Sequence, residues 1–225
     1  MIKVITFDLD DTLWDVRPAL VAAERAQNDY LETHFPGVLK DHSDDSLMAL
    51  KRSVLASDPA LKHNISVFRQ TFLQQLLLQA GIAEEEANSG SQEAFAAFLG
   101  KRNAVALYPT AEPMLRALAD RYTLGTLTNG NADVWQTPIG KYFSFAFRAE
   151  EVGAAKPEPN LFQKALEHTG RTPDQLLHVG DSHEHDVQGA RRVGARAIWL
   201  APSGEDNQSA DHVIRCLSEL PALLN

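Results

Sequence analysis

The residues whose types and spacing suggest chemistry begin with Asp8 and Asp10, in the segment VITFDLDDTLWD at residues 4–15. Side chains at positions i and i+2 of a strand point the same way, so both carboxylates would face one cleft where the strand ends. Such a pair can bind a hard divalent cation, Mg²⁺ above all, or one carboxylate can attack phosphorus while the other moves protons. The structural alternative is that Asp11 or Thr12 caps a following helix.

Two further segments place polar groups at predicted strand ends. In LTNG, Thr128 and Asn129 offer a hydroxyl and backbone N–H groups to phosphate oxygens, although Asn-Gly is also a common turn sequence. In AAKPEPN, Lys156 precedes a helix that begins with proline, where an ammonium can neutralise carboxylate and phosphate charge together. An ordinary surface lysine is the alternative at that position.

A last acidic segment, HVGDSHEHD, ends another predicted strand with Asp181 and continues to Asp186 at a helix start. Alone, this segment is also compatible with a helix N-cap. The intervening His183 and His185 are expected to face solvent, because the oxygen-rich character of the other residues favours Mg²⁺ over a transition metal. Four such segments, each at the carboxyl end of a strand, are hard to assign to capping alone.

The elements that must position these residues alternate between strand and helix patterns. Apolar strand segments end in polar or glycine residues, and amphipathic segments separate them, which predicts an α/β protein with a doubly wound parallel sheet and a site at the carboxyl ends of its strands. Strands are predicted at residues 3–7, 122–130, 143–153, 175–182 and 195–202, and helices at 110–121, 158–170 and 185–194.

Residues 15–106 interrupt this alternation with helix patterns only. An all-helical piece inserted after the first strand indicates a separate cap domain, so we expect a core of residues 1–14 and 107–225 and a cap of residues 15–106. Within it, NSGSQ at residues 88–92 is expected to be a loop. The cap helices are predicted at 17–35, 44–56, 66–81 and 92–103.

The composition of the 225 residues narrows the classes of function. With 44% hydrophobic and 23% charged residues and no apolar run near the roughly 20 residues that span a bilayer, a membrane protein is not expected. A formal charge of −9 disfavours nucleic-acid binding but leaves a small anionic substrate possible. Cys216, the only cysteine, suits a reducing compartment. With no secretory signal before residue 15, we expect a cytoplasmic protein.

Together DLDDT, TN, KP and GDSHEHD resemble the four motifs of the haloacid dehalogenase-like hydrolases, and the resemblance covers the whole chain. It implies a Rossmann-like core with an inserted helical cap. It also implies roles for each motif residue: Asp8 as nucleophile, Asp10 as general acid and then base, Thr128 and Asn129 as phosphate ligands, Lys156 as a partner of nucleophile and phosphate, Asp8, Asp181 and the Asp10 carbonyl as Mg²⁺ ligands, and Asp186 as an outer partner of Lys156 or of metal-bound water.

The resemblance implies a Mg²⁺-dependent phosphatase of small phosphorylated metabolites. Members that cleave carbon–halogen bonds resemble DxYGT where this chain has DLDDT, so Asp10 favours phosphate esters. A phosphosugar mutase fits the same motifs, and a phospho-acceptor or phospho-ligand binding module is the alternative from another class. The opening FDLDDTLWD, the length of the cap and the tail at residues 210–224 resemble the bacterial branch that dephosphorylates flavin mononucleotide (FMN) and the ribitylaminouracil phosphate of riboflavin synthesis.

Three side chains are candidates for substrate specificity. Trp14 can stack on a planar substrate ring or pack at the hinge between core and cap. Arg17 and Arg69 in the predicted cap can grip a substrate carboxylate or a second phosphate, although most arginines on helix faces are only solvated. The sequence does not predict an oligomeric state.

Overall fold

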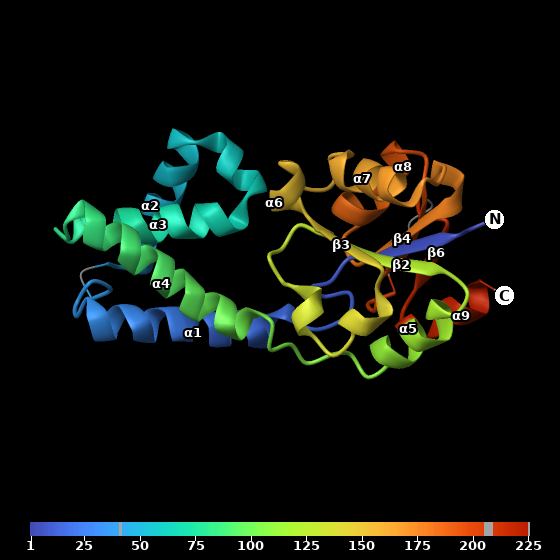
Figure 1. Cartoon of the computed structure of the whole chain (residues 1–225), viewed down its shortest axis with the longest axis horizontal. Helices are drawn as coiled ribbons and strands as arrows, with labels where there is room; N and C mark the ends of the chain where they lie inside the picture. The colour runs from blue at the N-terminus through green and yellow to red at the C-terminus, as the bar shows by residue number, and fades with distance from the viewer. Residues whose placement is uncertain (41, 205–208, 225) are drawn as a thin grey trace. The chain divides into compact units, whose positions relative to one another are not determined.

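The computed structural model describes residues 1–40, 42–204 and 209–224. Contacts group the chain into two compact units, one of Met1–Val16 with Val105–Asn225 and one of Arg17–Ala104 (Figure 1). Each unit is described separately below.

The first unit is built around a sheet in which every described pair of neighbouring strands is parallel. The strand order is β3-β2-β1-β4-β5-β6, so β1 lies in the interior of the sheet. The chain adds β2 and β3 on one side of β1 and then β4, β5 and β6 on the other side. The predicted α/β class with a doubly wound parallel sheet is therefore confirmed. The strands are β1 Val4–Phe7, β2 Thr123–Thr128, β3 Phe145–Arg148, β4 Leu176–Gly180, β5 Arg196–Leu200 and β6 His212–Ile214.

Helices cover both faces of this sheet, with α5 and α9 on one face and α7 and α8 on the other (Figure 1). Because both faces are covered, β1 and β4 are buried at every residue, as expected of central parallel strands. The helices of this unit are α5 Ala111–Ala119, α6 Ala149–Val152, α7 Asn160–Thr169, α8 Gly189–Arg192 and α9 Leu220–Leu223, with 3₁₀ turns at Val134–Gln136, Gly140–Tyr142, Pro173–Gln175 and Leu217–Glu219 and a π-helical turn at His183–Gln188.

Three segments of this unit differ from the sequence prediction. The helix predicted at 185–194 is divided into the π-helical turn His183–Gln188 and the short α8. The strand predicted at 143–153 ends at Arg148, because α6 follows at once and closes on Gly153 in the left-handed conformation (φ 69°). Strand β6 is absent from the prediction, because the apolar run HVI is only three residues long.

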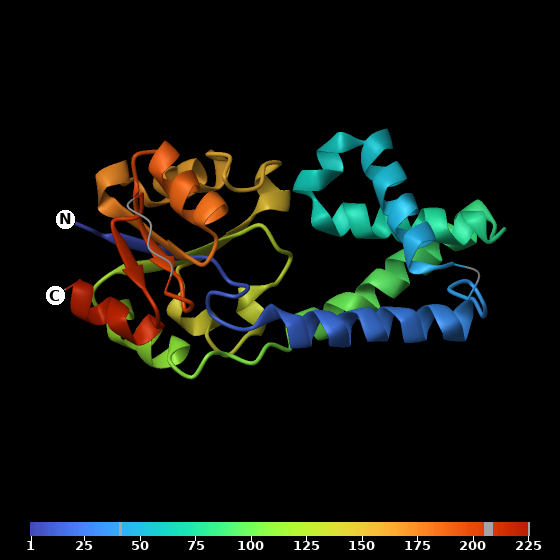
Figure 2. The same ribbon diagram turned by 180° about the vertical axis from the view of Figure 1, so that it is seen from behind.

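The second unit consists of helices packed on their own apolar core (Figure 2). Its third helix buries Phe72, Leu73, Leu76 and Leu77, which form one apolar face of the helix. The elements are α1 Val16–His34, α2 Asp44–Ser57, a 3₁₀ turn at Pro59–His63, α3 Ile65–Gln79 and α4 Glu84–Arg102.

The prediction of a loop at NSGSQ is wrong, because α4 continues through residues 88–92 without a break. The reason lies at Gly90, where a Cβ atom would stand 2.5 Å from the ring of Phe35. The glycine therefore serves close helix packing in this unit and not a turn.

Among the described residues, no helix is both long enough and apolar enough to cross a membrane.

Candidate active site

The chain turns sharply after β1 and brings the first motif to the end of the sheet. Asp11 has φ 57°, a left-handed conformation that aspartate tolerates better than most residues. Its carboxylate accepts a hydrogen bond from the backbone N–H of Val16 at 3.1 Å, so the capping alternative holds for Asp11. It does not hold for Thr12, whose hydroxyl donates to Asp181 at 2.9 Å and accepts from the Asp181 backbone N–H at 3.1 Å.

Asp8 lies directly after β1 and faces the Lys156 ammonium. Its carboxylate is 15% exposed, and Oδ1 stands 3.0 Å from Nζ of Lys156. Its backbone N–H donates to the carbonyl of Val179 on β4, which fixes this residue to the neighbouring strand. Asp8 is thus a buried carboxylate with one edge open and a cation beside it.

Lys156 is almost completely buried, and three oxygen atoms surround its ammonium. Nζ donates to the carbonyl of Leu127 at 2.7 Å and to Oδ1 of Asp186 at 2.6 Å, in addition to the Asp8 contact. Burial alone would lower the pKa of Lys156, but the carboxylates of Asp186 and Asp8 raise it above its ordinary value. The ammonium is therefore charged, and its position is fixed.

Asp186 is buried and accepts hydrogen bonds on both oxygens. Oδ1 receives Lys156 and also lies 3.0 Å from Nε2 of His178, while Oδ2 accepts the backbone N–H of Ser182 at 2.9 Å. Burial by itself would raise the pKa of Asp186, but Lys156 and the His178 hydrogen bond hold it well below its usual range. The structure thus brings Asp186 into direct contact with Lys156.

Two other carboxyl groups of the site, those of Asp8 and Asp181, have raised pKa values. Burial raises the pKa of Asp8 to about 7; Lys156 opposes this shift, and neighbouring carboxylates add to it. Burial and the charge of Asp186 raise the pKa of Asp181 to about 6. Two carboxyl groups that resist ionisation at one sheet edge suit a cation between them.

The donor set fits a hard divalent cation. One carboxylate oxygen from each of Asp8, Asp181 and Asp186 lies within 4.8 Å of the others. Because both oxygens of Asp186 already accept hydrogen bonds, Asp8 and Asp181 are the better ligands of the three. Carboxylate oxygens are the ligands that Mg²⁺ takes in proteins, and its charge would offset the repulsion that raises both pKa values.

Thr128 and Asn129 lie at the end of β2 and differ in what their side chains do. The Thr128 hydroxyl accepts the backbone N–H of Gly130 at 3.1 Å, which leaves its own hydrogen to donate. The Asn129 amide is paired with the backbone of Lys156, donating to its carbonyl at 2.9 Å and accepting from its N–H at 2.7 Å. Asn129 therefore ties two motifs together, and its contact with phosphate stays a prediction.

Comparison with known proteins identifies the chain. The haloacid dehalogenase-like hydrolase family matches it over residues 2–194. The chain belongs to this family. It is 33% identical over 205 residues to YigB of Escherichia coli (strain K12), a 5-amino-6-(5-phospho-D-ribitylamino)uracil phosphatase, over 91% of this chain and 86% of that protein.

Two other matches concern different activities. A phosphoserine phosphatase of Thermus thermophilus is 37% identical over 139 residues, which are 59% of this chain and 54% of that protein. The crystal structure described as a 2-haloacid dehalogenase from Pseudomonas syringae pv. Tomato DC3000 matches with a TM-score of 0.94 and 41% identity, over 100% of this chain and 98% of that one. The protein is thus a haloacid dehalogenase-like hydrolase. Its relatives include proteins named as phosphatases and one named as a 2-haloacid dehalogenase.

Asp10 in this hydrolase is held by Trp14. The Trp14 indole N–H donates to Oδ1 of Asp10 at 2.8 Å. Trp14 is completely buried in the core of its own unit, so it offers no ring face to a substrate. Of the two alternatives given for Trp14, the structure favours packing over stacking on a substrate, because the indole is buried in the core and its N–H is used on Asp10.

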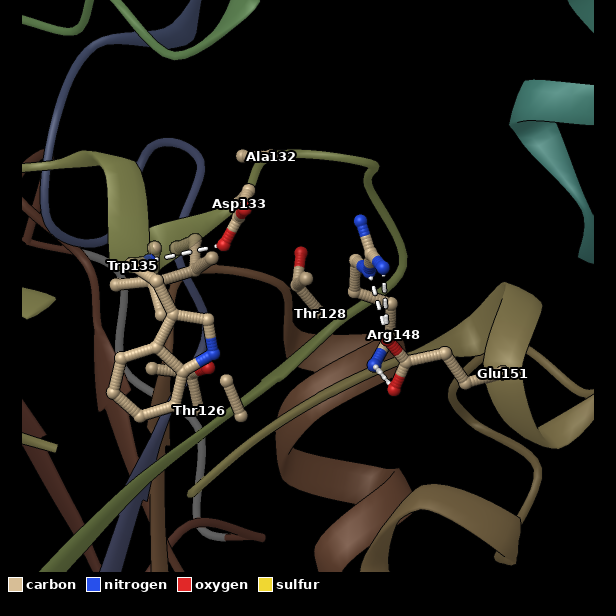
Figure 3. A pocket seen from close by; sticks show the side chains of 10 residues that line it. Thr126, Thr128, Ala132, Asp133, Trp135, Arg148 and Glu151 are labelled. Atoms are coloured by element: carbon tan, nitrogen blue, oxygen red, sulfur yellow. Dashed lines mark hydrogen bonds and ion pairs between the residues drawn. The ribbon is translucent and has the colours of Figure 1, made fainter. Parts of the chain in front are cut away.

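A pocket of about 100 Å³ adjoins Thr128 in this hydrolase. Figure 3 shows Thr128 between the 132–135 loop, with Asp133 and Trp135, and the ion pair of Arg148 with Glu151. Thr126 lines the same pocket because it lies two residues before Thr128 on β2 and faces the same way. The Thr126 hydroxyl is buried and has no hydrogen-bond partner among the described residues, so the pocket can receive a polar group.

The two arginines proposed for specificity lie on helices of the second unit. Arg17 is exposed in the first turn of α1. Arg69 donates to Gln27 at 3.1 Å, lies 3.7 Å from Glu24 and stacks 3.9 Å from the ring centre of Phe98. These contacts lie within the helical unit, and a contact of either arginine with substrate stays a prediction.

Sequence reasoning misses two residues of the site, Thr12 and His178. The sequence indicates only a capping role for Thr12, whereas its hydroxyl bonds Asp181. His178 is a histidine in the middle of the apolar strand LLHVG, and that polar residue inside a buried strand is the available signal. Its partner Thr6 lies directly opposite it on β1.

Proposed function

We propose that this hydrolase removes the phosphoryl group from phosphate monoesters of small metabolites through a covalent phosphoaspartate on Asp8. The observation that carries the proposal is the 3.0 Å contact between the Asp8 carboxylate and the buried Lys156 ammonium at the carboxyl ends of the central strands. The names of the Escherichia coli and Thermus thermophilus relatives, both phosphatases, support the same reaction.

In the first half-reaction an Asp8 oxygen attacks phosphorus, and the bond to the leaving alcohol oxygen breaks. Lys156 neutralises charge on both the nucleophile and the incoming phosphate, which lowers the electrostatic barrier. The Thr128 hydroxyl and the Asn129 backbone N–H hold phosphoryl oxygens. Asp10, protonated and oriented by Trp14, donates its proton to the leaving oxygen.

In the second half-reaction Asp10 acts as a base. It takes a proton from a water molecule, whose oxygen attacks phosphorus and releases the Asp8 carboxylate with inorganic phosphate. The two steps together return both carboxyl groups to their starting states. Asp186 does not take part directly but holds the ammonium that both steps require.

Mg²⁺ is the proposed cofactor, held by the carboxylates of Asp8 and Asp181 and by the backbone carbonyl of Asp10. When bound, the cation stabilises negative charge on the phosphoryl oxygens. The raised pKa values of Asp8 and Asp181 support this assignment, since burial disfavours their ionised forms and a bound cation would favour them.

The proposed substrates are FMN or the ribitylaminouracil phosphate of riboflavin synthesis. The similarity to YigB over 91% of this chain supports this choice. The helical unit is proposed to act as the cap that selects among substrates, and the pocket beside Thr128 is proposed to receive a polar group next to the phosphate (Figure 3).

Phosphate release tests the proposal directly. The panel contains FMN, a nucleoside monophosphate, sugar phosphates and phenyl phosphate, each with and without Mg²⁺. Release should require Mg²⁺ and should vanish in Asp8→Asn, which removes the nucleophile but keeps the side-chain shape. Substantial activity in Asp8→Asn, with a folded protein by circular dichroism, would eliminate the covalent mechanism.

Hydrolysis of 2-haloacids is the second candidate, favoured by the Pseudomonas syringae structure and its 41% identity. Displacement of halide by Asp8 needs no proton on the leaving group, so Asp10 would be dispensable for that step. Halide release from 2-chloropropionate by wild type and by Asp10→Asn, beside phosphate release, separates the two candidates. Halide release that survives Asp10→Asn, without phosphatase activity, would favour the dehalogenase.

A further inference from the structure

A continuous row of buried polar contacts runs from the sheet interior to the nucleophile. His178 is completely buried on β4, with the ring of Phe162 packed edge-on at 5.0 Å between ring centres. Its Nδ1 lies 2.9 Å from the Thr6 hydroxyl and its Nε2 lies 3.0 Å from Oδ1 of Asp186. The same Asp186 oxygen accepts Lys156, which reaches Asp8.

The proton positions along this row follow from charge. Burial lowers the pKa of His178, so its ring is neutral and carries one N–H. Since the ionised Asp186 can only accept, the hydrogen lies on Nε2 and points at that carboxylate. Nδ1 then accepts the hydrogen of the Thr6 hydroxyl.

The sheet supplies a rigid frame for the row. Thr6 and His178 are register partners on the parallel strands β1 and β4, so their side chains lie on the same face. Thr6 is also two residues before Asp8 on one chain segment, and the Asp8 N–H bonds to Val179 next to His178. Nucleophile and histidine are therefore fixed to the same pair of strands.

We propose that His178 and Thr6 are positioning residues that aim Lys156 at Asp8 by fixing the Asp186 carboxylate. The Lys156 ammonium donates hydrogen bonds to the carbonyl of Leu127 and to Asp186, and its nitrogen lies 3.0 Å from Oδ1 of Asp8 as an ion pair. If the Asp186 carboxylate turns, the ammonium follows its strongest partner and leaves Asp8. His178 prevents this by donating to the same oxygen that Lys156 uses.

This inference rests on the proposed function for its kinetic test, which compares three variants. His178→Leu removes the donor, His178→Gln keeps an N–H donor of similar reach, and Thr6→Val removes the support of Nδ1. We expect His178→Leu to lower kcat/KM about 10- to 100-fold, as for other residues that orient a contacting group. His178→Gln should restore most of the activity, and Thr6→Val should lie between them.

Thr137→Val is the matched control for Thr6→Val. It also removes a buried hydroxyl with a hydrogen bond, here to the carbonyl of Val134 at 2.7 Å, but has no contact with the row. Its kcat/KM should equal that of wild type although its melting temperature falls.

The loss of kcat/KM in His178→Leu should be the same for aryl and alkyl phosphates, because Lys156 assists attack and not departure of the leaving group.

A crystal structure of His178→Leu provides a readout that needs no turnover. Displacement of the Lys156 ammonium from Asp8, beyond the 3.0 Å of the wild-type chain, is the expected result. If wild type releases no phosphate from any ester, the proposed function fails while this structural comparison still decides the positioning. A folded His178→Leu with wild-type kcat/KM, equal losses in the Gln and Leu variants, or an unmoved ammonium would each overturn the inference.

Discussion

The Asp10 carboxylate presents one oxygen to the Trp14 indole at 2.8 Å, and this contact sets the direction of the other oxygen. A general acid must reach the leaving oxygen with good geometry as well as carry a proton. We therefore expect the buried Trp14 to affect the proposed reaction only by orienting the Asp10 carboxyl group.

Replacing Asp10 with Asn removes the proton donor while keeping the hydrogen bond acceptor for Trp14. Alkyl phosphates, whose alkoxide leaving groups need protonation, should lose about 10²- to 10⁴-fold in kcat. Phenyl phosphate should lose much less in the first step, because a phenolate leaves without help. Single-turnover rates on both esters measure this, with exposed Asp120→Asn as the control. Equal losses on the two esters would remove Asp10 from the acid role.

The Trp14→Phe variant tests the orientation effect. Phenylalanine keeps most of the buried apolar surface but cannot donate to Asp10. We expect a lower kcat on alkyl phosphates with little change in KM, because the residue does not touch substrate. Steady-state kinetics on an alkyl and an aryl phosphate separate the two parameters. A raised KM with an unchanged kcat would instead return Trp14 to a substrate-binding role.

At the level of elements, the sequence predicts the features that depend on local pattern. Strands β1, β2, β4 and β5 end within a few residues of their predicted ends, because in each of them polar, glycine or proline residues directly follow an apolar run. The loop prediction at residues 88–92 fails because Gly and Ser in a row resemble a loop, and only packing against Phe35 explains the glycine inside α4. The His178 contacts are not predictable from sequence, because they depend on the register between β1 and β4.

Two glycines of α4 provide a matched pair for this packing argument. At Gly100 an added Cβ meets nothing within 4 Å, whereas at Gly90 it would stand 2.5 Å from the Phe35 ring. Gly100→Ala should stabilise the protein by up to about 1 kcal/mol through helix propensity. Gly90→Ala should destabilise it by about 1–3 kcal/mol through overpacking, less any gain in propensity. Urea unfolding of both variants measures the difference, and a Gly90→Ala as stable as Gly100→Ala would refute the packing role.

At the scale of the whole chain, the proposed site gathers residues that are far apart in sequence onto the ends of neighbouring strands. Asp8 follows β1, Thr128 ends β2 and Asp181 follows β4, and in the sheet order β1 lies between the other two. The order in which strands are added reverses at β1, and doubly wound sheets bind ligands in the crevice at such a point. One consequence is that Asp8 and Asp181 lie close together and have raised pKa values, so we expect a bound cation to favour their ionised forms and to stabilise the protein.

That crowding predicts how Mg²⁺ and pH act together on stability. A carboxyl whose pKa rises from 3.8 to about 7 on folding costs the metal-free protein stability as pH increases between those values. Mg²⁺ would bind the ionised form of Asp8, so protons compete with Mg²⁺ for this carboxylate. One pH unit below the pKa of Asp8, the affinity of the protein for Mg²⁺ should therefore be about tenfold weaker. The rise in melting temperature on adding Mg²⁺ should therefore be larger at pH 8 than at pH 6.

Thermal unfolding at both pH values, with Mg²⁺ and with NaCl of equal ionic strength, measures this effect. Asp181→Asn, which removes a proposed ligand, should lose most of the Mg²⁺-dependent rise, whereas the exposed Asp120→Asn should keep it. The size of the rise reports the affinity, since stabilisation follows the ratio of free Mg²⁺ to its Kd. A rise that is equal at pH 6 and pH 8, or that Asp181→Asn retains, would place the cation away from Asp8 and Asp181.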